Sequence, residues 1–239
     1  MAIVSNTVNY LDGDTLLQAF FAYDDSFEAR RPAVLISHAW GGRDEFVNDK
    51  AKQLAELGYV AFALDMYGQG ILGANPEENA TLMQPFIDDR QFLQQRINAA
   101  LYALRLLPWV DDSRVAAIGF CFGGLCVLDL ARMGADVKGV VSFHGLLFPP
   151  ENNRDKPVVA KVLALHGHDD PMVTAEQVQA FTTEMSDLKV DWQLHSYGNT
   201  VHAFTNPEAN NPDFGTVYNA VADKRAWQSM KNFLKEVFV

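Results

Sequence analysis

The sequence contains only two cysteines, Cys121 and Cys126, among its 239 residues. Two thiols can build neither a disulfide framework nor a four-cysteine metal site, and a reducing compartment fits them best. The chain also lacks any run of about 18 apolar residues without charge, which a membrane-spanning helix would need. Its opening residues, MAIVSNTVNYLDGD, contain no basic segment and no sustained apolar one, so no secretory signal is visible. We therefore expect a cytoplasmic protein without a membrane partner.

Basic residues are scarce as well. The chain has 19 Lys and Arg against 30 Asp and Glu, a formal net charge of −11 at pH 7. This balance repels phosphate backbones, so we expect no nucleic-acid partner. With 49% hydrophobic and 21% charged residues, the composition is that of a globular protein and excludes disordered or collagen-like chains. The expected partner is a small molecule, and the expected assembly is a monomer or a homodimer.

No repeat, low-complexity tract or composition break divides the chain, which predicts a single domain over residues 1–239. Two segments rich in turn-forming residues, 149–157 and 206–215, are short enough to be surface loops of one domain. Near the start, alternating residues on both sides of Asp12-Gly13-Asp14 predict an antiparallel hairpin that leads into a sheet.

Beyond the hairpin, strand and helix patterns alternate. Continuous apolar runs are typical of strands that are covered on both faces. Apolar residues at three- and four-residue spacing predict amphipathic helices over 93–104, 178–185 and 227–234. The alternation predicts an α/β fold with a mostly parallel sheet and helices on both of its faces. The expected strands lie at residues 33–37, 59–64, 115–118, 137–143, 162–165 and 190–194.

The most informative segment is GFCFGG, residues 119–124, between an expected strand and a helix-compatible stretch. It has the form of a nucleophile elbow, a strained strand-to-helix turn that carries the central residue, here Cys121. The flanking glycines allow close backbone packing, and the start of a helix favours a thiolate. A free cysteine is more often a small buried hydrophobe, and this is our interpretation of Cys126, inside the expected helix.

A catalytic thiol needs a base, and the base needs an orienting acid. In elbow hydrolases these follow in the order nucleophile, acid, histidine. Asp170 follows the strand VLAL and precedes Pro171, whereas His202 lies in a loop after the last strand. We therefore predict a triad of Cys121, Asp170 and His202, with Asp169 as the alternative to Asp170.

The remaining histidines are weaker candidates for the base. His144 and His166 directly follow apolar strands and are interpreted as hydrogen-bonded wall residues, and His195 lies within a strand pattern. His168 precedes the expected acid instead of following it. The sequence does not favour a metal site built from His166, His168, Asp169 and Asp170. Successive residues at the end of a strand point to alternating sides, and the sequence indicates no further ligand from elsewhere in the chain. We expect no metal and no cofactor.

An oxyanion hole should combine two backbone amides, one of them from the residue after the nucleophile, Phe122. The second should come from the loop after strand 33–37, which reads SHAWGG. Trp40 is the candidate donor in this loop, and its ring could also form a wall of the substrate pocket.

These residues resemble the dienelactone hydrolase family of α/β-hydrolases. The resemblance covers nearly the whole chain through the motifs SHAWGG, LDMYGQG, GFCFGG, LHGHDDPMV and YGNTVHAF. It implies an α/β-hydrolase fold with an eight-stranded, mostly parallel sheet and no large cap domain. The family's catalytic cysteine, aspartate and histidine fall on Cys121, Asp170 and His202.

Two departures from the family pattern bear on the substrate. Members that act on dienelactone usually carry a glutamate where this chain has Ala39, and an arginine shortly after the histidine, where this chain has Ala203-Phe204-Thr205-Asn206. Without the arginine a bidentate clamp for a carboxylate is lost, which favours a neutral, apolar or aryl ester. Trp40, Ala39 and Phe204 are the expected substrate-binding residues.

The resulting hypothesis is a cysteine-dependent esterase with a thioester intermediate. Since no carboxylate at position 39 competes for His202, we expect the thiol to ionise below the free value of ~8.5. Activated phosphotriesters, which are neutral and have good leaving groups, are an expected secondary substrate. The alternatives are a lactone hydrolase of the dienelactone type, a redox protein that uses Cys121 alone, and a ligand-binding module without catalysis. A class I glutamine amidotransferase is disfavoured, because no histidine has Glu two residues later.

Overall fold

The computed structural model describes residues 2–152 and 157–239. Eight strands, β1 to β8, form the mostly parallel sheet that the sequence predicts, and the described residues add six helices and two short strands. The chain divides into two compact units, Met1–Ile118 and Gly119–Val239, which are described in turn. A single domain over the whole chain stays a prediction. None of the helices within the described ranges is both long and apolar enough to cross a membrane.

The first unit begins with the predicted hairpin. Its two strands pair antiparallel from Ile3↔Asp24 to Asp12↔Thr15, and Gly13 in the two-residue turn has a φ of +56°. The strand order in this unit is β1-β2-β4-β3, with β3 and β4 parallel. Its elements are β1 (Ile3–Asp12), β2 (Thr15–Asp24), β3 (Arg31–Ser37), α1 (Glu45–Glu56), β4 (Val60–Ala63), α2 (Pro76–Asp88), α3 (Arg90–Arg105) and most of β5 (Val110–Phe120).

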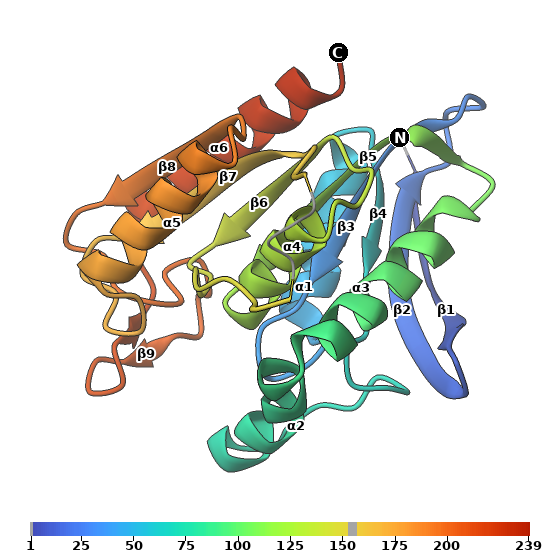
Figure 1. Ribbon diagram of the computed structural model, residues 1–239. Coiled ribbons are helices and arrows are strands. Elements are labelled where there is room, and N and C mark those ends of the chain that lie inside the picture. The colour runs from blue at the N-terminus through green and yellow to red at the C-terminus, as the bar shows by residue number, and fades with distance from the viewer. Residues whose placement is uncertain (1, 153–156) are drawn as a thin grey trace. The chain divides into compact units, whose positions relative to one another are not determined.

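Helices cover both faces of the strands in this first unit. In Figure 1, α3 passes in front of the strands and α1 lies behind them. The predicted apolar stripe of α3 is the face that is buried, because residues three and four apart lie on one side of a helix. The buried stripe consists of Leu93, Ile97, Ala100, Leu101 and Leu104.

The second unit contains three parallel strands in the order β6-β7-β8. The apolar residues of β6 and β7 are buried throughout, as continuous apolar strands between two helix layers should be. In Figure 1, α4 and α5 lie in front of these strands and α6 behind them. The elements are the end of β5, α4 (Phe122–Arg132), β6 (Gly139–Phe143), β7 (Lys161–Gly167), α5 (Ala175–Asp187), β8 (Trp192–Tyr197), β9 (Asn210–Asn211), β10 (Thr216–Val217) and α6 (Ala220–Val237).

Because β6, β7 and β8 are parallel, their carboxyl ends lie at the same edge of the sheet in the second unit. Residues that directly follow β6, β7 and β8 gather at the carboxyl ends of the strands, where ligands bind in open α/β sheets. The segment 206–215, expected as a loop, contributes β9 to a small hairpin with β10. Of the other expected loop, 149–157, residues 153–156 lie outside the described part of the chain.

Candidate active site

The turn at Cys121 has the strained geometry of a nucleophile elbow. Cys121 is the N-cap of α4, directly after β5, with φ +54° and ψ −117°. A positive φ at a residue with a Cβ costs on the order of 1–3 kcal/mol and persists only when the surroundings enforce it. Here the Cys121 amide donates to the Phe143 carbonyl at 3.0 Å, and the Gly124 amide donates to the Cys121 carbonyl at 2.9 Å. The side chain, partly exposed, therefore stands at the start of a helix.

Two glycines of the elbow, Gly119 as predicted and Gly124, are needed for space. A Cβ at Gly119 would collide with the backbone of Gly123, and a Cβ at Gly124 would collide with Ser142 and Gly145. Both contacts involve backbone atoms that cannot move aside without opening the turn. Cys126, five residues on, is fully buried in α4, which agrees with its interpretation as a core residue.

Asp170 and His202 form a direct hydrogen bond. His202 Nδ1 lies 2.7 Å from Asp170 Oδ2, and both side chains are buried. The second oxygen of the carboxylate, Oδ1, accepts from the Met172 amide at 2.8 Å. Both oxygens of Asp170 are therefore engaged, one by the turn after β7 and one by the imidazole.

The small hairpin holds the backbone of His202. The His202 amide donates to the Gly215 carbonyl at 3.0 Å, and the His202 carbonyl accepts from the Val217 amide at 3.2 Å. Gly215 in turn packs so closely on Pro171 that any Cβ there would collide with the proline ring. The turn that carries the acid and the loop that carries the histidine are thus packed against each other.

The electrostatics of His202 link it to Cys121. Burial by itself would lower the pKa of His202, but the charge of Cys121 and the hydrogen bond with Asp170 raise that pKa to about 10. An opposite charge beside an imidazole favours its protonated form. The three residues predicted from the sequence therefore come together within the second unit.

Asp169, the alternative acid, has a different role in the structure. It is exposed, and its Oδ2 accepts from the Thr200 amide at 3.1 Å. The Asp169 amide donates back to the Thr200 carbonyl at 3.0 Å. Asp169 therefore ties the loop before His202 to the end of β7, whereas Asp170 contacts the imidazole.

A second histidine lies beside His202. The rings of His144 and His202 meet edge to face with centroids 5.1 Å apart, and His144 Nε2 lies 2.8 Å from Thr205 Oγ1. His144 is buried, with a φ of +38°. The sequence indicated a hydrogen-bonded wall residue but not its contact with His202. The one available signal was its position, directly after a strand at the edge that carries the elbow.

Phe204, an expected substrate-binding residue, is fully buried. Its ring packs edge to face on His144 and on Tyr197, with centroids 5.1 Å and 5.6 Å away. Phe204 thus supports the ring of His144, and its contact with a substrate stays a prediction. Phe122, the first residue of α4, is also fully buried, so any part it takes in an oxyanion hole is through its backbone amide.

Ala39 and Trp40 belong to the first unit, in the loop between β3 and α1, and both are half-buried. Three successive carbonyls in this loop accept hydrogen bonds. The Ala39 carbonyl accepts from the Gly42 amide at 3.1 Å, the Trp40 carbonyl from Tyr67 Oη at 2.7 Å, and the Gly41 carbonyl from the Gly73 amide at 3.1 Å. The loop backbone is therefore held in one conformation from several sides.

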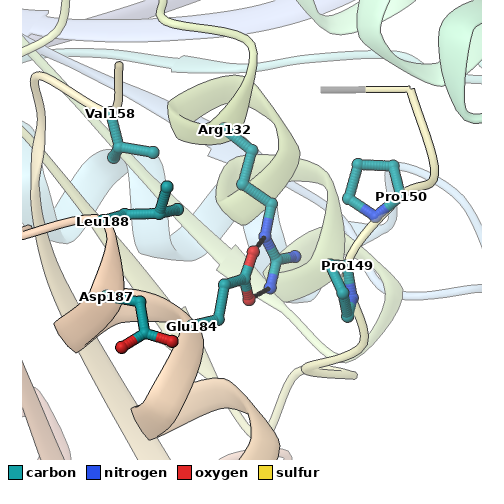
Figure 2. A pocket seen from close by; sticks show the side chains of 7 residues that line it. All are labelled: Arg132, Pro149, Pro150, Val158, Glu184, Asp187 and Leu188. Atoms are coloured by element: carbon teal, nitrogen blue, oxygen red, sulfur yellow. Dashed lines mark hydrogen bonds and ion pairs between the residues drawn. The ribbon is translucent and has the colours of Figure 1, made fainter. Parts of the chain in front are cut away.

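The second unit has a cavity of about 350 Å³ whose lining includes none of Cys121, Asp170 and His202 (Figure 2). The guanidinium of Arg132 forms a paired salt bridge with Glu184 at 2.9 Å and 2.7 Å beside it. None of the described residues that line it is a nucleophile or a general base paired with one, so the cavity is not the candidate site. Over the described ranges, no group of three or more His, Cys, Asp or Glu side chains is placed to hold a metal ion. The lining residues are Arg132, Pro149, Pro150, Val158, Glu184, Asp187 and Leu188.

Several known proteins resemble this chain. The model of the dienelactone hydrolase family matches residues 17–238. An uncharacterized protein of Caenorhabditis elegans is 41% identical over 149 residues, which is 61% of this chain and 94% of the relative. A protein of Bradyrhizobium sp, named "Probable 2-oxo-3-(5-oxofuran-2-ylidene)propanoate lactonase", is 29% identical over 223 residues, 86% of this chain and 84% of the relative.

Among solved structures, a dienelactone hydrolase-like promiscuous phosphotriesterase from metagenomic libraries is 37% identical. The match covers 100% of both chains with a TM-score of 0.93. This likeness confirms the α/β-hydrolase fold that the sequence predicted.

Proposed function

Because the chain belongs to the dienelactone hydrolase family and is an ester-hydrolysing enzyme, we propose that Cys121, His202 and Asp170 are its catalytic triad. The observation that carries the proposal is the 2.7 Å hydrogen bond between His202 Nδ1 and Asp170 Oδ2, on a histidine that also interacts with Cys121. With Nδ1 donating to the carboxylate, the other nitrogen, Nε2, is the one available to the thiol.

The proposed reaction has two halves. In the first, the Cys121 thiolate attacks the ester carbonyl carbon, and the carbonyl oxygen becomes an oxyanion. As this intermediate collapses, the alkoxide or phenolate leaves with a proton from His202 Nε2, and a thioester remains on Sγ. In the second half, neutral His202 removes a proton from water, the hydroxide attacks the thioester, and the acid departs while the imidazolium–thiolate pair is restored.

The oxyanion in both halves is proposed to bind the backbone amides of Phe122 and Trp40. Amides that are aimed in advance at the developing charge need no reorganisation during the reaction, and one such donor is worth about 2.7–4 kcal/mol. Phe122 N lies at the start of α4, where the helix dipole adds to the favourable field.

The proposed substrate is a neutral ester with an apolar or aryl group. Position 39 is alanine, where family members that act on dienelactone usually carry a glutamate. The loop after His202 contains Ala203, Phe204 and Thr205 but no arginine. The ring of Trp40 and the side chains of Ala39 and Phe204 are proposed to line the pocket. A lactone is the second candidate, supported by the lactonase name of the Bradyrhizobium relative.

A substrate panel distinguishes these candidates. We expect p-nitrophenyl esters to be hydrolysed with a kcat/KM at least about 100-fold higher than an anionic lactone, because no cationic clamp offsets the cost of burying a carboxylate. Paraoxon is expected to turn over slowly in the wild type and to stop after one equivalent in Cys121→Ser, since a serine phosphoester is the more stable intermediate. A preference for the anionic lactone would instead support the second candidate, and absence of any paraoxon turnover would remove the secondary activity.

The resting state is expected to be an imidazolium–thiolate pair. Since the pKa of His202 is raised to about 10, its proton should remain in place at pH 7–9, and thiolate absorbance at 240 nm should appear well below the ~8.5 of a free thiol. His202→Ala should lose this absorbance at pH 7. A thiolate titration above 8.5 in the wild type would contradict the pair.

The same ion pair should make the stability of the folded protein depend on pH. A histidine whose pKa is higher in the folded than in the unfolded state stabilises the fold at pH values below about 6.5, and this contribution is lost as the pH rises through the folded-state value of about 10. Since the thiol of the unfolded chain keeps its proton up to ~8.5, we expect the Tm of the wild type to fall between about pH 8.5 and 10 more steeply than the Tm of Cys121→Ala, which lacks the partner charge.

A further inference from the structure

His38 is completely buried at the end of β3, at the start of the loop that carries Trp40. Its two ring nitrogens contact two different backbone groups. Nδ1 lies 2.6 Å from the carbonyl oxygen of Ala39, and Nε2 accepts from the amide of Met66 at 3.1 Å. The sequence by itself indicates no role for this histidine.

These two contacts define the tautomer of the ring. A backbone amide can only donate, so Nε2 must carry the lone pair that accepts from Met66. The proton is therefore on Nδ1, from which it is donated to the Ala39 carbonyl. Burial lowers the pKa of His38 to about 4, which keeps the ring neutral at pH 7.

The Met66 amide is itself held firmly. The Asp65 carboxylate accepts from the amides of Tyr67, Gly68 and Gly70 at 3.0, 2.8 and 2.9 Å. This hydrogen-bonded turn surrounds Met66 in the chain and sets the direction of its N–H. The ring of Tyr67 also meets the ring of His38 edge to face, with centroids 4.9 Å apart.

The orientation of the Ala39 carbonyl determines the direction of the Trp40 N–H, because both belong to the same peptide group. The peptide that joins Ala39 to Trp40 is planar and trans, so its C=O and N–H point in opposite directions. The Ala39 oxygen accepts hydrogen bonds from His38 Nδ1 and from the Gly42 amide, so it faces the His38 ring. The Trp40 N–H consequently points away from His38.

We propose that His38 is a positioning residue for the oxyanion hole, and that it aims the Trp40 amide by holding the Ala39 carbonyl. The inference rests on the proposed function, which assigns the Trp40 amide to the hole. His38 would thus contribute to transition-state stabilisation without contacting the substrate.

Two polar variants separate the two hydrogen bonds of His38. In His38→Asn, Nδ2 occupies the place of Nδ1 and can still donate to the Ala39 carbonyl, while the bond from Met66 is lost. In His38→Gln, the longer side chain can accept from Met66 through Oε1 but is not placed to donate to Ala39. Both variants lose one hydrogen bond, so a merely structural role predicts similar losses of activity and of Tm.

The proposal predicts an unequal result. With a p-nitrophenyl ester, His38→Gln should lower kcat by about 10–100-fold at nearly unchanged KM, since misorienting a donor weakens only the bond made to the transition state. His38→Asn should stay within about fivefold of the wild type. Thiolate absorbance at 240 nm should be unchanged in both, because the Cys121–His202 pair is untouched.

Equal losses in the two variants, or a His38→Gln enzyme with wild-type kcat, would overturn the proposal. Nitrogen-15 chemical shifts of His38 in the wild-type protein test it without any variant, and a proton on Nε2 would overturn it. A failure of the proposed function looks different, because Cys121→Ala would then keep its esterase activity whatever the His38 variants do.

Discussion

Replacing Cys121 by alanine is expected to lower kcat/KM for p-nitrophenyl acetate on the order of 10⁵-fold or more. Removal of a nucleophile abolishes the covalent route and leaves only the catalysis that binding and the oxyanion donors provide. The substitution places a small residue at a partly exposed turn, so the fold should survive, and Tm and circular dichroism check this. Initial rates with the wild type and the variant, at equal folded concentration, give the ratio.

Cys126→Ala is the matched control, because Cys126 is the other thiol of the chain and lies buried in α4. This variant should keep kcat/KM within about threefold and should still acquire one acyl group, detected as a mass increase on Cys121 under rapid quenching. Wild-type rates in Cys121→Ala would exclude the cysteine mechanism. Loss of activity in Cys121→Ala with retention in His202→Ala would favour the redox alternative, which uses the thiol without the base.

Asp170→Asn is expected to lower kcat by about 10⁴-fold, the scale seen when a triad histidine is held in the wrong tautomer. The reason lies in the two contacts of the carboxylate. The Met172 amide donates to one oxygen and His202 Nδ1 bonds to the other. Asparagine has a single oxygen, so once Met172 takes it, the NH₂ group faces Nδ1 and the imidazole must carry its proton on Nε2. The base is then protonated on the nitrogen that should accept.

Asp169→Asn is a near-isosteric control on the adjacent residue. Its amide oxygen can still accept from the Thr200 amide, so kcat should stay within about threefold of the wild type. The readout is kcat across pH 6–9, together with Tm to verify folding. A larger loss in Asp169→Asn than in Asp170→Asn would reverse the assignment of the acid.

The features that could be predicted from the sequence are those formed by residues close together in the chain. The elbow depends on residues within five positions of each other: glycines where a Cβ would meet backbone, and a strand and a helix on either side of Cys121. The hairpin at Gly13 and the apolar stripe of α3 are equally local. Such features follow from backbone sterics and side-chain periodicity, which a sequence displays directly.

The acid that bonds to His202 could not be established from residues close together in the chain. Asp169 and Asp170 are neighbours in the chain with the same side chain. The position of Asp170 before Pro171 favoured it as the acid, but this local pattern does not show which carboxylate faces the histidine 32 residues later. The answer depends on the direction in which β7 exits and on the hairpin that positions His202 through Gly215. The segment 206–215 was expected as a plain loop for the same reason, since two-residue strands are too short to have a pattern.

The roles of the other histidines were set by packing alone. His144 meets His202 because β6 lies beside β7, and His38 donates to Ala39 because the Met66 amide faces its opposite nitrogen. Composition and spacing thus established the family of folds, the strained thiol and the candidate acids and bases. Which nitrogen carries a proton, and which carboxylate meets which ring, depended on contacts between segments distant in the chain, whose free energies no local pattern contains.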